Sequence, residues 1–175
     1  MKRLFESKKT SIFTKWHKEQ RVPKTNVFRH PADGEAWKHF DKEFGWFADD
    51  QRNIRLGMAT DGFNPFGHRS NAYSMWPVFV IPYNFPPWMC MDQNNFMMSL
   101  LIPGKHAPGK DFHVFMQPLI KDMMELWSGV ETRDACAADP FSTACCFFGS
   151  YMIILGMPLC LAVAQKAITH VCTAM

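Results

Sequence analysis

Apolar and other residues alternate most regularly in residues 53–66, which read NIRLGMATDGFNPF. Every second residue from Ile54 to Met58 is apolar, and this period of two predicts a strand with one buried face and Arg55 on the other face. An Asp-Gly pair ends the run at Asp61, and an Asn-Pro pair follows. Both pairs favour turns, so the sequence predicts a carboxylate at the exit of a strand.

Asp61 has two interpretations. A strand exit is a place where a rigid element can hold a catalytic group beside backbone that bends toward a ligand, so Asp61 is a candidate catalytic residue. Alternatively, its carboxylate closes an Asx-turn and takes part in no chemistry.

Two helices are expected before this strand. The first is a short basic helix at residues 7–20, followed by a polar connector. The second covers residues 33–44, with Asp33 as its N-cap and Gly45 at its end. Apolar residues expected on the buried sides of these helices are Ile12, Phe13, Trp16, Ala36, Trp37, Phe40 and Phe44.

Two more strands and a long helix are predicted after residue 66. Pro77 and Pro82 limit the run at residues 75–81 to a short or edge strand, because proline cannot donate a ladder hydrogen bond. The run at residues 96–102 is the next strand. Apolar residues at helical spacing over residues 111–130 predict a core helix, which Pro118 should kink or divide.

Other candidate sites have weak support. The proline-rich and aromatic loop at residues 82–95 is a possible stacking platform for nucleic acid, but such loops more often pack on a core. Residues 104–110 lack the spacing of a Walker phosphate loop, and we interpret them as a connector. His17 and His39 have no partner at ligand spacing, so we expect both at the surface and neither on a metal.

Charge is distributed unevenly along the 175 residues. The net charge is +3, but residues 1–30 contain nine Lys or Arg against two Glu. A basic arm of this kind is a hint of nucleic-acid binding, although it is more often solvated surface. We expect no signal peptide, because the start MKRLFESKK has no apolar core behind it. The six cysteines are therefore expected to be reduced thiols.

Composition changes sharply near residue 135. Residues 1–134 hold 33 of the 35 charged side chains, whereas residues 135–175 hold two of them and five of the six cysteines. We therefore predict one domain in three parts: a basic N-terminal arm (1–30), an α+β core (31–134) and a hydrophobic tail (135–175).

The expected order of strand, strand, strand and helix is that of the start of an RNase H-like domain. In that architecture the helix leads to a fourth strand beside the first, which brings a second carboxylate near the first one. Phosphoryl transfer with two metal ions about 4 Å apart needs such a pair, and Asp61 alone cannot hold both ions.

Several blocks of sequence resemble a known family. They are RLFESKKT, WHKE, RHPADGEAWKHFD, RNIRLGMATDGFNPFG, YSMWPVFVIPYNFPPWMCM, FMMSLLIPG, PGKDFHVFMQPL and ELWSGVET. Over about residues 3–135 the chain resembles the transposase of plant En/Spm-like (CACTA) DNA transposons. The resemblance implies an incomplete RNase H-like domain, with three strands and then a helix, because the family's later blocks have no counterpart here.

The resemblance also implies a function. That family cuts transposon ends and joins them to target DNA with Mg²⁺ or Mn²⁺, in the nucleus, and its first catalytic and metal-binding aspartate corresponds to Asp61. The later acidic catalytic residues have no match, and active enzymes of this kind are several times longer. We therefore expect an inactive transposase fragment whose partner is DNA and which has no small-molecule substrate.

The tail has an explanation at the level of codons. One DNA string encodes residues 149–175 and, read from one nucleotide earlier, also encodes WIIYDYPGNASVSGCSTKGYHACVYCN. The second reading closely resembles the family's next block, a strand that ends in the second aspartate and is followed by a Cys-x-x-Cys pair. Our hypothesis is that a frameshift or a misplaced splice replaced the native sequence.

Two alternatives stay open. Residues 144–165 carry no charge over a length that would span a bilayer, which is typical of a tail anchor, although Pro158 argues against it. A non-catalytic DNA-binding remnant would instead use the basic arm. If the native fourth strand is missing, the strand at residues 54–60 has an aggregation-prone edge, unless residues 151–155 (YMIIL) replace it.

Overall fold

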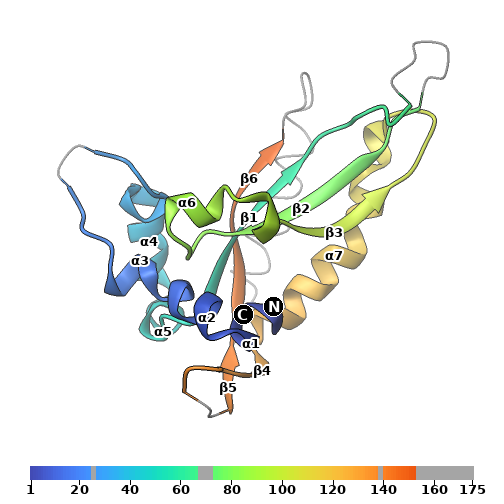
Figure 1. Cartoon of the computed structure of the whole chain (residues 1–175). Coiled ribbons are helices and arrows are strands. Elements are labelled where there is room, and N and C mark those ends of the chain that lie inside the picture. Colours follow the sequence, from blue (N-terminus) through green and yellow to red (C-terminus); the bar gives the residue numbers. More distant parts are fainter. Residues whose placement is uncertain (25–26, 67–72, 138–139, 153–175) are drawn as a thin grey trace.

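A four-stranded mixed sheet lies at the centre of the computed structural model, which describes residues 1–24, 27–66, 73–137 and 140–152 (Figure 1). Its strand order is β3-β2-β1-β6, and β4 and β5 form a separate two-stranded sheet. The strands are β1 (Ile54–Thr60), β2 (Trp76–Pro82), β3 (Met97–Ile102), β4 (Val130–Arg133), β5 (Pro140–Thr143) and β6 (Cys145–Met152). The expected α+β class is confirmed.

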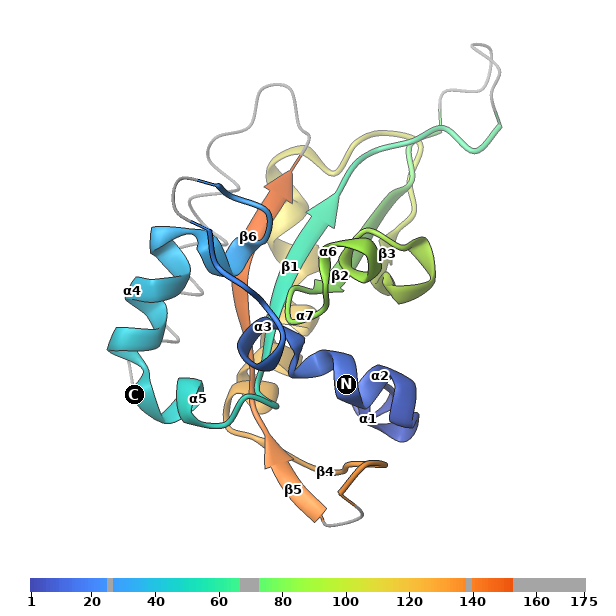
Figure 2. The same cartoon turned by 60° about the vertical axis from the view of Figure 1, so that its left-hand side comes forward.

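Helices lie on both faces of the sheet (Figure 2). The α-helices are α1 (Arg3–Glu6), α2 (Lys8–Thr14), α3 (Trp16–Glu19), α4 (Glu35–Glu43), α5 (Gly45–Asp49), α6 (Pro87–Cys90) and α7 (Phe112–Trp127). Three short 3₁₀ helices are η1 (Pro31–Asp33), η2 (Gln93–Asn95) and η3 (Gly109–Asp111). Helix α7 crosses one face, and α3 and α4 lie on the other.

The fourth strand is the main correction to the expected fold. β1 is antiparallel to β2 and parallel to β6, so it has hydrogen-bonded neighbours on both sides. The expectation of three strands with an unpaired edge on β1 is therefore wrong. The sequence from Cys145 is uncharged and apolar enough to pair beside a buried strand. The replacement strand expected at residues 151–155 begins earlier, at Cys145, and residues 153–155 lie outside the described part.

The same finding bears on the alternative of a tail anchor. Within residues 144–165, the part from Cys145 to Met152 is β-strand, and residues 153–165 lie outside the described part. In the described ranges, no helix combines the length and the apolar character needed to cross a membrane.

The core between the sheet and α7 explains the apolar stripe of that helix. Met116, Leu119 and Met123 pack with Leu56 and Val78 of the central strands in one buried cluster. Burial of each such side chain contributes roughly 1.5–3 kcal/mol.

Helix α7 runs through Pro118 without a break, so the expected division of the helix is wrong, whereas the alternative of a kink stays a prediction. The Pro118 side chain is exposed. Gly129, with φ of 95°, follows the end of the helix.

Both faces of β1 are buried, which differs from the expected half-buried strand. Arg55, expected on an exposed face, is only 1% exposed. Helices α4 and α5 cover this face, and their rings at Trp37, Phe40 and Phe47 lie 4.4–5.7 Å from the Arg55 guanidinium carbon. The strand therefore sits between two helical layers.

The N-terminal helices pack through polar residues. Ile12 was expected on the buried side but is 46% exposed, whereas Ser11 and Thr14 are fully buried. The reason is a buried polar network: Ser11 donates to Asp134, and the side-chain amide of Asn84 donates to the Thr14 carbonyl at 3.1 Å. These partners lie far away in sequence, so helical spacing alone does not indicate them.

The start of α4 differs from the expectation. Gly34, not Asp33, precedes α4, and the Asp33 carboxylate accepts hydrogen bonds from the backbone N–H groups of Arg29 and His30 at 2.9 and 3.0 Å.

The position of β2 in the sheet also differs from the expectation. β2 is a central strand of seven residues, not a short or edge strand. Its prolines are tolerated because they lie near its two ends, with a register shift next to β3 between Val78 and Phe79.

Candidate functional site

Asp61 lies directly after β1, as predicted, and its side chain is exposed. Its Oδ1 accepts a hydrogen bond of 2.8 Å from the backbone N–H of Gly62. The Asn-Pro turn also forms, since Asn64 Oδ1 accepts the N–H of Phe66 at 3.0 Å. The strand exit therefore presents one solvent-facing carboxylate beside a local turn.

Gly62 is required by a neighbouring ring. A Cβ atom at Gly62 would lie 2.5 Å from Cε2 of Trp76, which is closer than real side chains approach. The Trp76 Nε1–H donates to Ser74 Oγ at 2.8 Å. The chain does not turn sharply at Gly62, because Phe63 and Met75 exchange two backbone hydrogen bonds of 2.9 Å. Trp76 and this backbone pair together hold the exit of β1 against the start of β2.

The parallel neighbour of β1 ends at the same edge of the sheet. The register runs from Ile54 with Cys145 to Thr60 with Met152, and it shifts once between Leu56 and Gly57. The carboxyl ends of two neighbouring parallel strands lie side by side. The residues that follow the last described pair on β1 and β6 are therefore expected to be neighbours. On β1 that residue is Asp61; on β6 it is Ile153, which lies outside the described part.

The described residues do not by themselves fit a two-metal site. Asp61 offers a single carboxylate, and no group of three His, Cys, Asp or Glu side chains in the described ranges could hold an ion. Two bridged ions need several carboxylate oxygens. The role of Asp61 as a metal ligand therefore stays a prediction.

The two histidines considered from the sequence differ in the structure. His39 is exposed, as expected, but His17 is 6% exposed and packs on the Trp37 ring at 5.4 Å. Burial, followed by the positive charge of Arg55, lowers the pKa of His17 to about 3. The surface location expected for His17 is therefore wrong. A neutral, buried imidazole has a structural role here, next to Arg55.

Thiol chemistry has little support in the core. Burial raises the pKa of Cys90 to about 12 and that of Cys145 also to about 12. Only the thiolate is a good nucleophile, so these two residues act as small apolar core groups.

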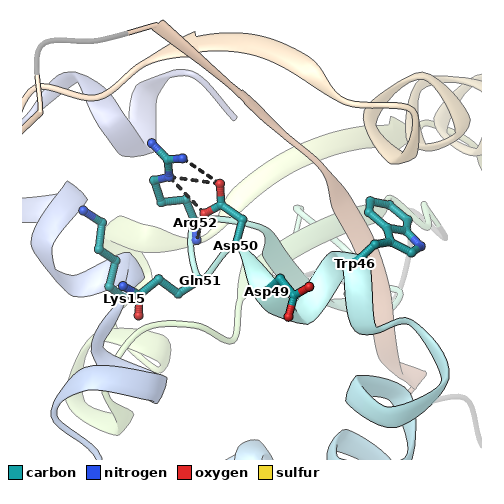
Figure 3. Close-up of a pocket in the computed structure, with 6 residues that line it drawn as sticks. All are labelled: Lys15, Trp46, Asp49, Asp50, Gln51 and Arg52. Atoms are coloured by element: carbon teal, nitrogen blue, oxygen red, sulfur yellow. Dashed lines mark hydrogen bonds and ion pairs between the residues drawn. The ribbon is translucent and has the colours of Figure 1, made fainter.

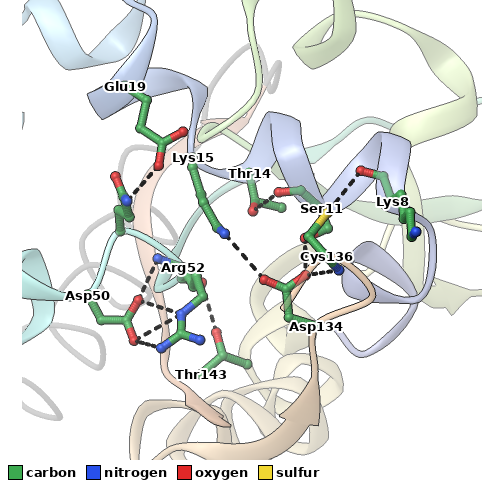
Figure 4. A network of polar contacts seen from close by, with 11 residues as sticks. Lys8, Ser11, Thr14, Lys15, Glu19, Asp50, Arg52, Asp134, Cys136 and Thr143 are labelled. Carbon is green, nitrogen blue, oxygen red and sulfur yellow. Dashed lines mark hydrogen bonds and ion pairs between the residues drawn. The ribbon is translucent and has the colours of Figure 1, made fainter. Parts of the chain in front are cut away.

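A buried carboxylate that the sequence did not indicate joins the N-terminal helices to the chain beyond β4 (Figure 4). Asp134 accepts hydrogen bonds from the Ser11 hydroxyl and from the backbone N–H of Cys136, at 2.5 and 2.8 Å. Lys15 Nζ lies 3.3 Å from its other oxygen. Burial by itself would raise the pKa of Asp134, but the hydrogen bonds and Lys15 hold that pKa below its ordinary value. Ser11 and Lys15 are each more than one hundred residues from Asp134 in the sequence, so no local signal could have found these two partners.

A polar hollow of about 550 Å³ lies at the amino-terminal end of β1, away from Asp61 (Figure 3). It is lined by Lys15, Trp46, Asp49, Asp50, Gln51 and Arg52. Its two cations already have partners, since Arg52 pairs with Asp50 at 2.6 Å and Lys15 with Asp134. The hollow therefore offers no unpaired positive charge to a ligand, and Asp49 is its one lining carboxylate without an ion pair among the described residues.

Comparison with known proteins gives one result on family membership. A family model described as "Transposase family tnp2" matches residues 25–163, which is most of the chain. The match continues past residue 135, where the resemblance noted from the sequence was expected to end. No curated protein and no solved structure matches the chain. The strand exit at Asp61 and the whole central sheet lie within the matched residues, and the chain belongs to the transposase family tnp2.

Proposed function

We propose that the chain is a remnant of the catalytic core of an En/Spm-like (CACTA) DNA transposase with an RNase H-like fold. Asp61 is the first catalytic aspartate in this proposal, and Mg²⁺ or Mn²⁺ is the ion that the intact enzyme uses. DNA is the partner, and the nucleus is the place of action. The family membership supports the coarse assignment.

The parallel pairing of β1 with β6 is the observation that carries the finer assignment. The described pairing of the two parallel strands runs as far as Thr60 and Met152, and a carboxylate directly follows Thr60. A carboxylate after the second strand would complete a pair at one edge of the sheet. Such a pair is the minimum that phosphoryl transfer with two metal ions needs.

The codon hypothesis supplies the missing carboxylate at that position. In the second reading of residues 149–175, WIIYDYPG replaces GSYMIILG. The aspartate is the fifth residue of this string, so its codon position is that of Ile153, the residue after Met152. The alternative reading thus has an aspartate directly after the last described pair, as β1 does. We propose that the frame changes at Gly149, inside β6.

The printed sequence is then expected to be catalytically inactive. Ile153 has no carboxylate, and the described residues hold no complete metal site. Binding to DNA without cleavage is the behaviour that remains, and it corresponds to the non-catalytic remnant considered from the sequence.

The test compares two chains that differ only in the tail. One is the printed sequence, and the other has residues 149–175 replaced by the second reading; each is also made with Asp61→Asn. Mn²⁺ binding is measured by calorimetry, because Mn²⁺ prefers carboxylate ligands over the added cysteines. The replaced chain should bind Mn²⁺ at least tenfold more tightly than the printed chain, and Asp61→Asn should remove the difference.

Equal Mn²⁺ affinity in the two chains would contradict the proposal, and so would a gain that survives Asp61→Asn. Sequencing the locus and its transcript gives an independent check. If no frame of the nearby DNA encodes the second string, the frame hypothesis is wrong even where the family assignment holds.

A further inference from the structure

The basic segment at the start of the chain is folded onto the domain. Leu4 and Phe5 of α1 are buried in the same cluster as β1, and the backbone N–H of Ala135 donates to the Phe5 carbonyl at 2.9 Å. Asp134 holds α2 through Ser11 and Lys15. The backbone that carries the cations of α1 and α2 is therefore anchored to the domain.

Up to the end of α2, four of these cations have exposed side chains and are not neutralised. Lys15 is paired with Asp134, and Arg21 with Asp33. The exposed cations on α1 and α2 and before them form no ion pair with a carboxylate in the described ranges. They are Lys2, Arg3, Lys8 and Lys9, and we name them the basic face. Glu6 is the acidic residue in the same stretch.

The basic face lies at the end of the sheet opposite to Asp61. Figures 1 and 2 show α1 and α2 beside β4 and β5, at the amino-terminal end of β1, whereas Asp61 follows the carboxyl-terminal end. The seven residues of β1 separate the two ends by roughly 20 Å at about 3.3 Å per residue. One base-pair step of duplex is about 3.4 Å, so the two locations are about six base pairs apart along β1.

We propose that the basic face binds the phosphate backbone of double-stranded DNA, at a location separate from the Asp61 end. Charge complementarity selects this partner: unpaired cations meet closely spaced phosphates, and release of counterions drives binding. The inference rests on the proposed function for the identity of the polyanion. The proposed contact between DNA and the basic face is separate from the Asp61 site. It does not depend on the catalytic residues, so it is expected even where they are absent.

The reactivity of Cys136 can be used to detect DNA bound at the basic face. Its side chain is exposed, and its Sγ lies 3.5 Å from the backbone carbonyl oxygen of Lys8, as Figure 4 shows. The described cysteines other than Cys136 are buried. DNA on the basic face should therefore slow the alkylation of Cys136 by a maleimide.

The experiment measures binding of the full chain to a 20-base-pair duplex of arbitrary sequence by fluorescence anisotropy, between 50 and 200 mM salt. Lys8→Glu with Lys9→Glu should weaken binding at least tenfold and reduce the slope of log K against log salt by about 2, near 0.9 per lost phosphate contact. The matched control is Lys42→Glu with Lys121→Glu, which makes the same charge change at exposed lysines on α4 and α7. It should change affinity by less than threefold.

Mass spectrometry of the alkylated cysteines should show that the duplex slows maleimide alkylation of Cys136 in the parent chain. It should not slow this reaction in the variant with Lys8→Glu and Lys9→Glu. Equal loss of affinity in both charge variants would overturn the inference, because net charge alone would then explain binding. Binding that is lost in Asp61→Asn but kept in the Lys8, Lys9 variant would place DNA at the Asp61 end, which overturns this inference and leaves the proposed function intact. Protection of Cys136 by phosphatidylserine vesicles but not by DNA would identify a membrane surface as the partner.

Discussion

The Nζ atom of Lys15 lies 3.3 Å from a carboxylate oxygen of Asp134, which is buried below the N-terminal helices. Ser11 and the N–H of Cys136 donate to the other oxygen. This carboxylate joins α2 to the chain that leads from β4 to β5. A buried carboxylate is tolerated only when its oxygens have such partners.

Removal of the Asp134 carboxylate should therefore destabilise the fold. Asp134→Ala leaves Ser11 and a backbone N–H without their charged acceptor, and hydrogen bonds to charged groups contribute about 1.5–3 kcal/mol each. We expect a loss of about 2–4 kcal/mol in the free energy of unfolding, measured in urea. Asp134→Asn keeps an acceptor oxygen and should lose less.

Asp49, which is exposed, gives the control for this change. Asp49→Ala should alter stability by less than about 0.5 kcal/mol. The pKa of Asp134 is lowered in the fold, so its contribution is present above the pKa of the unfolded state and is lost as the pH falls through the folded pKa. Equal stability of Asp134→Ala and the parent would contradict this assignment.

His17 should make stability depend on pH between about 3 and 6.5. Burial lowers its folded pKa from 6.5 to about 3, so within this window the unfolded chain binds a proton that the folded chain does not. Stability therefore falls as the pH falls, by about 1.4 kcal/mol per pH unit for this group. From pH 7 to pH 4.5 the loss should be roughly 2–3 kcal/mol.

The variant His17→Gln should flatten this dependence, and His39→Gln, at an exposed position, should leave it unchanged. His30 keeps part of the slope in both variants, because burial also lowers its pKa. Urea unfolding at a series of pH values measures the effect. The assignment to His17 is wrong if the two variants show the same slope.

Local sequence patterns predict where helices and strands form better than they predict which elements pack against each other. The period of two at β1 and the apolar stripe of α7 are local, and both elements form where expected. The exposed side of β1 was predicted wrongly because Arg55 is buried only by rings that come from α4 and α5. A charge that the tertiary structure surrounds cannot be recognised from alternation alone.

At the candidate site too, local features were predicted from the sequence, whereas contacts between distant segments were not. Asp61 at a strand exit is a local feature, and the structure places it there. The segment of β6 is open to three interpretations from its sequence, as a membrane anchor, an out-of-frame tail or a replacement strand, because an apolar run without charges has no property that separates them. Asp134 and Lys15 were missed because their contact joins distant segments.

Gly62 should tolerate no larger residue. A Cβ atom in Gly62→Ala would meet the Trp76 ring at 2.5 Å, so the ring or the strand exit has to move. Overpacking of this kind costs about 1–3 kcal/mol. We expect a lower melting temperature and a shifted tryptophan emission.

Gly45→Ala is the matched control, because a Cβ atom there meets nothing within 4 Å. It should be neutral or stabilise the protein by up to about 1 kcal/mol, since alanine loses less backbone entropy on folding. A Gly62→Ala variant as stable as Gly45→Ala would show that the contact with Trp76 does not constrain the Asp61 exit.

Arg55 and Asp41 should respond to mutation unequally. The Arg55 guanidinium is buried among three rings and pairs with Asp41, while its Nε has no hydrogen-bond partner among the residues that the structure describes. Asp41→Asn leaves this cation without its counter-charge, and removal of one partner of a buried pair is strongly destabilising. Asp41 is itself about one-third exposed, so we expect a reduced loss of about 1–3 kcal/mol.

Arg55→Met removes the cation and fills the space between the rings with an apolar side chain of similar length. Replacement of buried charges by apolar groups is often neutral or stabilising, so Arg55→Met should change stability by less than about 1 kcal/mol. In the double variant the loss caused by Asp41→Asn should disappear, because no buried cation remains. Urea unfolding of the parent, the two single variants and the double variant tests this prediction. A larger loss of stability from Arg55→Met than from Asp41→Asn would contradict it, because the contacts of the cation with the rings would then contribute more than its ion pair with Asp41.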